Sequence, residues 1–181
     1  DIPIRHVNAA ILKRMNRRGT RQELDALFAK LRREIPGLVL RTSLIAGLPG
    51  EGEAEFDELC QWLREQKLER AGAFAFSPEE GTPAAAMEHP DEQTAQRRAE
   101  ILGELQSDVM DEYNTSRFGQ DMEVLCEGYD EESERFFGRT YADSPDIDGR
   151  VLFASNRDVP VGSFVTVHID GAQDGDLIGT E

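Results

Sequence analysis

Strand-like apolar runs alternate with helical patterns along the first half of the chain. The runs cover residues 2–7, 38–46 and 71–76, and helices with apolar stripes are predicted from Thr20 to Pro36 and over residues 54–66. Strands separated by helices of this length are typical of βαβ units with a parallel sheet. A complete barrel of such units needs roughly 250 residues, so three strands predict only part of a barrel.

The two helices each have a clear apolar face. Thr20 and Glu23 have the spacing of a capping box, which stabilises a helix by about 1 kcal/mol. Apolar residues then recur at helical spacing. They are Leu24, Leu27, Phe28 and Leu31 in the first helix and Phe56, Leu59, Cys60 and Leu63 in the second.

From Gln120 the pattern changes to short β-runs separated by turn signals. A long helix from Asp91 to Arg117 precedes them, and the five runs cover residues 121–126, 136–141, 149–154, 163–169 and 176–180. Five short strands in this length are typical of a small closed barrel of the OB type. The fold class is therefore α/β plus all-β, with a partial barrel over 1–90, a connecting helix over 91–118 and a small β-barrel domain over 119–181.

Residues 38–51 combine a buried strand with polar side chains. The strand carries Arg41 and Ser43 on one face and leads through Gly47 into a Gly-Leu-Pro-Gly-Glu turn. Polar groups near the carboxyl end of a parallel strand are where α/β proteins place ligand chemistry. Arg41 could bind the carboxylate of a ligand. Alternatively, Arg41 could be a partner in an interior ion pair, and Ser43 could be a small packing residue. A phosphate-binding loop is excluded, because no Gly-Lys-Ser/Thr follows the glycines.

The net charge of −16 is unevenly distributed. Residues 119–181 hold four basic and 15 acidic residues, whereas residues 1–118 hold 16 basic and 21 acidic residues. Such a domain repels phosphate backbones and attracts basic partners, although acidity can also serve solubility alone. The basic residues Lys13, Arg14, Arg17, Arg18 and Arg21 could touch RNA, but such a run is more often a solvated helix end.

The two cysteines and the hydropathy bear on the cellular compartment. Cys60 and Cys126 lie in apolar patterns far apart in the chain, and we expect two reduced, buried thiols in a cytoplasmic protein. No apolar run approaches the roughly 18 residues of a membrane span, so we expect no membrane association. Because the chain opens as if inside a strand, we expect it to be a piece of a longer protein.

Four ordered blocks resemble the radical SAM methylthiotransferases. They are residues 1–8, 11–18, 41–51 and 72–82. The last of them, Gly-Ala-Phe-Ala-Phe-Ser-Pro-Glu-Glu-Gly-Thr, resembles the branch that modifies a ribosomal protein. Residues 138–140, 145–149, 161–164 and 176–177 are similar to that branch's TRAM domain.

The resemblance implies an enzyme that adds a methylthio group to the β-carbon of an aspartate in the twelfth protein of the small ribosomal subunit. It implies S-adenosylmethionine and two [4Fe–4S] clusters as cofactors. Clusters are held by several cysteine thiolates, and this chain has only two cysteines. We therefore expect the cluster ligands outside the chain, no metal site within it, and no activity of the chain alone.

The resemblance also assigns a cofactor-binding face. Ile45 and Gly47 match the segment that passes the adenine of S-adenosylmethionine, and Arg41 and Ser43 lie beside it. His6 faces the same cavity in the family, although an isolated histidine is often structural, and Arg5 stands where the family usually has Gln. Phe76 could stack on an adenine, although core packing of Phe74 and Phe76 is the commoner role. These expectations give the candidate site His6, Arg41, Ser43, Ile45, Gly47 and Phe76.

Two other functions remain open. A tRNA-adenosine methylthiotransferase would have the same radical SAM core, but its TRAM domain resembles a basic, RNA-gripping barrel. A non-catalytic module could dock a basic partner through its acidic barrel. The acidic barrel favours a basic ribosomal protein as the partner over RNA.

Overall fold

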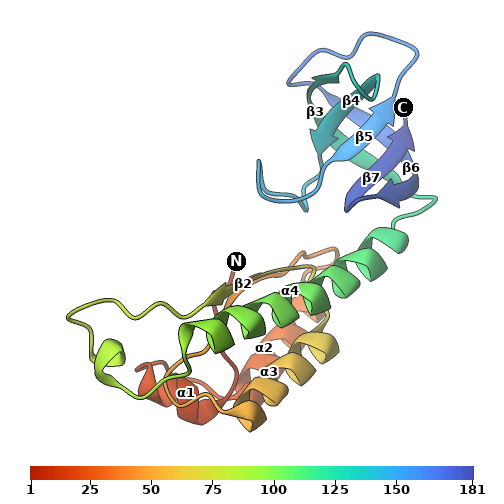
Figure 1. Ribbon diagram of the computed structural model, residues 1–181. Coiled ribbons are helices and arrows are strands. Elements are labelled where there is room, and N and C mark those ends of the chain that lie inside the picture. The colour runs from red at the N-terminus through yellow and green to blue at the C-terminus, as the bar shows by residue number, and fades with distance from the viewer. The chain divides into compact units, whose positions relative to one another are not determined.

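The computed structural model describes all residues, 1–181, and divides into two compact units. The first unit comprises Asp1–Val109 and the second comprises Met110–Glu181. The division falls within the long helix that we expected to connect two domains (Figure 1). None of the helices combines the length and the apolar character needed to cross a bilayer.

The first unit consists of helices and a small parallel sheet. Strand β1 pairs with β2 in parallel, with Arg41 opposite Arg70 and Ala46 opposite Ala75. The predicted helices and these two strands are confirmed, with bounds shifted by a few residues at most ends. The elements in chain order are α1 (Ala9–Arg14), α2 (Arg21–Glu34), β1 (Arg41–Ala46), α3 (Glu53–Gln66), β2 (Arg70–Ala75), the 3-10 helix η1 (Pro83–Ala86) and α4 (Glu92–Thr115).

The prediction of a strand over residues 2–7 is wrong. This segment runs beside β1, where the Arg5 N–H donates to the Ser43 carbonyl at 2.9 Å, but it forms only one isolated parallel bridge, between Arg5 and Leu44. Pro3 has no N–H to donate, and Arg5 has a φ of 70°, in the left-handed region. A strand cannot continue through such a residue. The sheet therefore has two strands, and these residues do not by themselves form a partial barrel.

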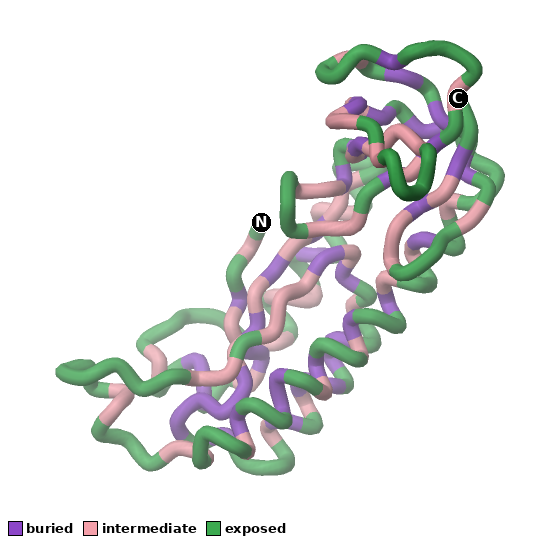
Figure 2. Tube along the Cα trace, turned by 45° about the horizontal axis from the view of Figure 1, so that its top comes forward, coloured by how far each residue is buried: buried purple, intermediate pink, exposed green.

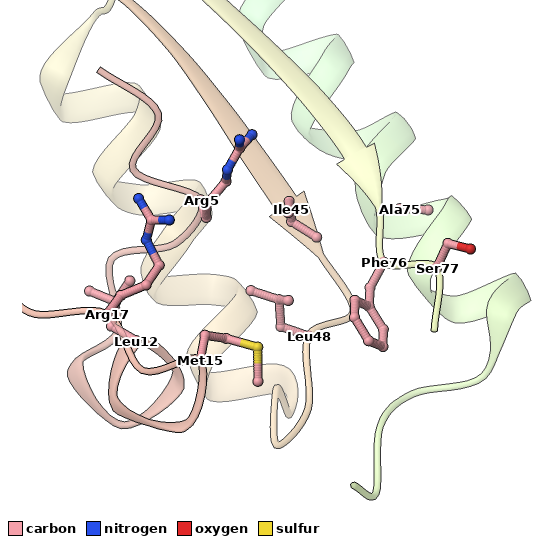
Figure 3. Close-up of a pocket in the computed structure, with 9 residues that line it drawn as sticks. All are labelled: Arg5, Leu12, Met15, Arg17, Ile45, Leu48, Ala75, Phe76 and Ser77. Carbon is pink, nitrogen blue, oxygen red and sulfur yellow. The ribbon is translucent and has the colours of Figure 1, made fainter. Parts of the chain in front are cut away.

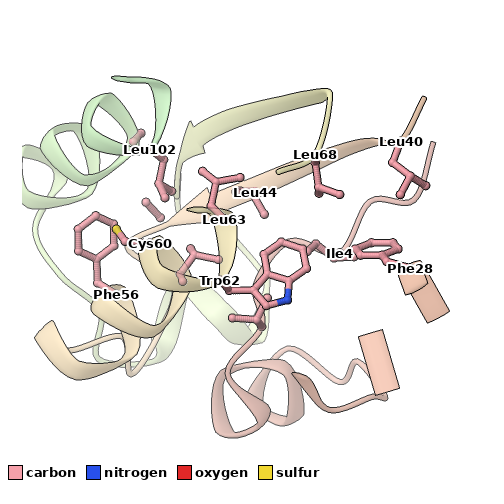
Figure 4. Packing of buried hydrophobic residues seen from close by; sticks show 14 residues of the cluster. Ile4, Phe28, Leu40, Leu44, Phe56, Cys60, Trp62, Leu63, Leu68 and Leu102 are labelled. Atoms are coloured by element: carbon pink, nitrogen blue, oxygen red, sulfur yellow. The ribbon is translucent and has the colours of Figure 1, made fainter. Parts of the chain in front are cut away.

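The core of the first unit lies between the sheet and the helices. Trp62 is fully buried, and its ring centroid lies 5.8 Å from that of Phe28 (Figure 4). The predicted face of α3 is confirmed, since Phe56, Leu59, Cys60 and Leu63 are all buried. In α2 the capping box of Thr20 and Glu23 is present in both directions. Leu27, expected on the buried face of that helix, is 39% exposed.

The second unit is a closed five-stranded barrel, as predicted. The strand order is β3-β4-β5-β7-β6, and β3 pairs with β6 to close the barrel. All pairs are antiparallel except β5 with β7. Buried and exposed residues alternate along β6 (Figure 2), as expected when one face of a strand fills a barrel. The strands are β3 (Asp121–Asp130), β4 (Arg135–Arg139), β5 (Val151–Ala154), β6 (Phe164–Gln173) and β7 (Asp176–Thr180).

Candidate functional site

One face of the β1–β2 sheet is covered and the other is accessible. In β1, Thr42, Leu44 and Ala46 are buried, while the alternate residues are partly exposed. In β2, Ala71, Ala73 and Ala75 pack against the core, while Phe74 is 57% exposed. The prediction that Phe74 packs in the core is therefore wrong. The sheet presents a mixed polar and aromatic face, although parallel sheets normally have both faces covered.

A cavity of about 340 Å³ lies at the carboxyl edge of this sheet (Figure 3). Ile45 contributes from near the end of β1, and Phe76 directly follows β2. The Phe76 ring also meets the His89 ring edge to face, with 5.3 Å between centroids. Most of the lining is apolar, and its polar members are two arginines and a serine. The lining comprises Arg5, Leu12, Met15, Arg17, Ile45, Leu48, Ala75, Phe76 and Ser77.

Helix α1 supplies the opposite wall of the cavity, and the sequence analysis missed it. The Asn8 side chain accepts hydrogen bonds from the N–H groups of Ala10 and Ile11, so it caps a helix of only six residues. Asn16 has a φ of 54°, a left-handed conformation that asparagine tolerates well. The turn lets the Arg17 N–H donate to the Leu12 carbonyl at 2.8 Å. The available signal was the capping Asn8 ahead of the apolar pair Ile11-Leu12.

The other predicted site residues lie outside the cavity lining. Arg41 and Ser43 share the accessible face of β1 with Ile45, as the strand period predicts. His6 is fully buried, and its Nδ1 accepts a hydrogen bond from the Asn8 N–H at 3.0 Å. The ring therefore holds its proton on Nε2, which lies 3.3 Å from Glu51 Oε2. This arrangement gives His6 a structural contact, the alternative that the sequence left open.

Glu51, at the end of the Gly-Leu-Pro-Gly-Glu turn, is a buried carboxylate with three neighbours. Its Oε1 accepts from the Gly47 N–H and from Arg98 Nη1, each at 2.9 Å, while Oε2 faces His6. Burial acts to lower the pKa of Arg98, but the hydrogen bonds that its guanidinium donates to Glu53 and Glu51 outweigh burial and raise the pKa. Glu51 thus joins the segment before α1, the turn after β1 and helix α4. No local pattern in the sequence indicates this role of Glu51.

Gly47 is required at its position by packing. Its φ is +80°, and a Cβ built there would lie 2.4 Å from the Cβ of Ala95 on α4. Glycine has no Cβ and tolerates positive φ, so the turn can pass this close to the helix. The contact of Gly47 with an adenine, expected from the family resemblance, stays a prediction.

The two cysteines do not fit a cluster site. Both are free and buried, Cys60 in the first unit and Cys126 in the barrel, which confirms the expectation of buried thiols. Burial raises the pKa of each thiol, whereas a metal ligand must be a thiolate. No group of three or more His, Cys, Asp or Glu side chains in residues 1–181 is arranged to hold a metal ion.

The barrel surface is acidic, and most of its few cations are paired with acids. Three of the four arginines in residues 119–181 contact carboxylates, in the pairs Arg139 with Glu127, Arg150 with Asp176, and Arg157 with Glu181. Apolar side chains are also exposed on its loops, with Tyr141 70% and Ile147 77% accessible. A surface of this kind offers carboxylates and apolar contacts to a partner, and little free positive charge.

Comparisons with known proteins identify one domain of the chain. The family model of the TRAM domain matches residues 118–181.

Three curated relatives carry the name ribosomal protein uS12 methylthiotransferase RimO. The relative from Clostridium botulinum (strain Hall) is 40% identical over 180 residues, which cover 99% of this chain and 40% of the relative. The relative from Caldanaerobacter subterraneus subsp. tengcongensis is 41% identical, with coverage of 99% and 41%. The relative from Desulforudis audaxviator is 43% identical, with coverage of 98% and 39%. The chain thus spans about two fifths of the length of these relatives.

Proposed function

Because the chain is homologous over its whole length to the RimO methylthiotransferases and ends in a TRAM domain, we propose that it supplies the cofactor-binding face and the substrate-docking domain of a uS12 methylthiotransferase. The reaction adds a methylthio group to the β-carbon of an aspartate of uS12. The observation that carries the cofactor part of this proposal is the apolar cavity at the carboxyl edge of an accessible sheet face. Ligands of open α/β sheets bind at that edge.

The residues of the cavity fit the nucleoside part of S-adenosylmethionine. A volume of about 340 Å³ lies within the range of small-molecule pockets, roughly 300–1,000 Å³. Ile45 and Phe76 offer an apolar wall and an aromatic ring to an adenosyl group. In the family, S-adenosylmethionine supplies the methyl group and, when bound beside a cluster, the radical chemistry. The role of this chain is to bind and orient that cofactor and to exclude water from one side of it.

The chain does not fit the iron–sulfur clusters. Its two thiols are buried in separate units, and a [4Fe–4S] cluster needs several thiolates together. We assign the cluster ligands to the part of the protein that corresponds to the remaining three fifths of the relatives. Further strands of a radical SAM barrel would pair at the edges of the β1–β2 sheet, and its accessible face would then line the barrel interior.

The barrel domain is assigned to binding of uS12 through charge and apolar contact. Its 15 acidic residues outnumber four basic residues, and three of those four contact carboxylates. Complementary charge speeds association with a basic ribosomal protein and suppresses wrong partners. An RNA backbone would meet repulsion from the same surface.

The tRNA-modifying alternative has one feature in its favour. Lys13, Arg14, Arg17 and Arg18 are exposed in and after α1, and exposed cations can bind phosphates. Arg21, counted with them in the sequence, forms ion pairs with Asp25 and Glu65. The acidic barrel weighs against this alternative, because a TRAM domain that holds tRNA needs positive charge.

Phe76 provides the test of the cofactor face. Replacing Phe76 with alanine is expected to weaken binding of S-adenosylmethionine to the chain about tenfold, since loss of aromatic stacking on a base costs about 1–3 kcal/mol. Phe74→Ala is the matched control, because Phe74 lies two residues earlier, within β2, and does not line the cavity. Isothermal titration calorimetry measures both affinities. Equal effects of the two substitutions would remove Phe76 from the cofactor site.

A further inference from the structure

The cavity beside Ile45 and Phe76 has two arginines that contact no carboxylate. Arg5 and Arg17 contribute the only charged side chains of its lining. In Figure 3 both side chains extend to the same side, above Met15 and Leu48 in that view. The cavity is therefore apolar at one end and cationic at the other.

Neither of these arginines has an acidic partner, although the chain has a net charge of −16. Several other arginines of the first unit do contact carboxylates. The pairs are Arg21 with Glu65, Arg32 with Glu69, Arg33 with Glu34, and Arg98 with Glu51 and Glu53. Because no side chain of the chain neutralises Arg5 or Arg17, the mouth of the cavity retains positive charge for a ligand.

Backbone hydrogen bonds hold both arginines in place. The Arg5 N–H donates to the Ser43 carbonyl at 2.9 Å, and the Arg5 carbonyl accepts from the Ile45 N–H at 2.8 Å. Arg17 Nη2 donates to the Pro3 carbonyl at 2.5 Å. A guanidinium has five N–H donors, so Arg17 keeps donors for a ligand while one anchors it. Arg5 lies beside β1, and Arg17 follows α1 and extends to the same side of the cavity as Arg5 (Figure 3).

We infer that Arg5 and Arg17 bind the carboxylate of a ligand whose apolar part fills the cavity. Guanidinium groups match carboxylates in fork geometry, with strong charge-assisted hydrogen bonds. This inference rests on the proposed function, which offers two such carboxylates. One belongs to the amino-acid end of S-adenosylmethionine, and the other is the side chain of the target aspartate of uS12.

Two matched ligand pairs test the inference on the 181-residue chain by isothermal titration calorimetry. The first pair is S-adenosylmethionine and 5′-methylthioadenosine, which keeps the nucleoside but lacks the amino-acid end with its carboxylate and α-ammonium group and also lacks the sulfonium charge. The second pair is a uS12 peptide with its target aspartate and the same peptide with asparagine. In at least one pair the carboxylate ligand is expected to bind about tenfold more tightly, as for a charge-assisted hydrogen bond.

Three variants locate that preference. Arg5→Gln and Arg17→Gln are each expected to remove most of the tenfold difference. Arg18→Gln is the control, since Arg18 is adjacent and exposed but does not line the cavity, and it should keep the difference. Fluorescence of Trp62, the single tryptophan, confirms that each variant has folded.

The outcomes separate the ligand sources and the two proposals. A preference in the adenosyl pair that depends on Arg5 and Arg17 assigns the cofactor's carboxylate, and one in the peptide pair assigns the substrate's. A preference that Arg18→Gln removes equally overturns the inference. Equal binding within both pairs also overturns it, and leaves the proposed function standing if 5′-methylthioadenosine still binds through Phe76. Failure of all four ligands to bind overturns both.

Discussion

Replacing Glu51 with alanine is expected to lower the free energy of unfolding of the first unit by about 3 to 5 kcal/mol. Removing one partner of a buried ion pair costs this much, because the remaining charge stays buried without compensation. The side chains of Glu51 and Arg98 are 0% and 7% exposed. The substitution also leaves the Gly47 N–H and His6 Nε2 without the carboxylate that they face.

Urea unfolding monitored by Trp62 fluorescence measures this effect. Trp62 is the single tryptophan and is fully buried in the first unit, so the signal reports that unit and not the barrel. Glu53→Ala is the matched control, because Glu53 also contacts Arg98 but its side chain is 85% exposed. Loss of such an exposed ion pair should cost at most about 1 kcal/mol. Similar costs for the two substitutions would contradict the central role of Glu51.

Gly47→Ala is expected to destabilise the first unit by about 2 to 5 kcal/mol. Overpacking against α4 contributes about 1–3 kcal/mol, because the new Cβ would lie 2.4 Å from the Cβ of Ala95. The left-handed backbone adds about 1–2 kcal/mol for any residue with a Cβ.

Gly81→Ala separates the two contributions. Gly81 has nearly the same φ, +81° against +80°, but nothing lies within 4 Å of the Cβ that would be built there. This control should therefore cost only about 1–2 kcal/mol in the same urea experiment. If both alanine variants lose the same stability, close packing of the turn on α4 is not the reason for Gly47.

The elements of this fold that follow from local pattern could be predicted from the sequence. Buried and exposed residues alternate along β6 and along the first half of β3, and the capping box at Thr20 marks the start of α2. The prediction of a strand over residues 2–7 was wrong, because the segment has the apolar alternation of a strand but its backbone does not have strand geometry. Arg5 has a left-handed backbone conformation, which arginine rarely adopts. No pattern in the sequence predicts it.

The candidate site was less predictable, because its geometry depends on residues far apart in the chain. The strand period correctly placed Arg41, Ser43 and Ile45 on one face. The strand period could not show that Glu51 would accept a hydrogen bond from Arg98, 47 residues later. That contact joins the turn after β1 to helix α4. Nor could the strand period bring Arg17 to the cavity, since this position depends on a six-residue helix and the left-handed Asn16.

The central proposal is that this chain contributes to uS12 methylthiolation by binding S-adenosylmethionine at its sheet face and uS12 at its acidic barrel. The most direct test is a chimera in which the chain replaces the aligned two fifths of the Clostridium botulinum RimO relative. The purified, cluster-loaded chimera is incubated with uS12, S-adenosylmethionine, a sulfur source and reductant, and peptides of uS12 are analysed by mass spectrometry. We expect one methylthio group on one aspartate of uS12. A folded, cluster-loaded chimera that leaves uS12 unmodified, or that modifies tRNA instead, would contradict the account.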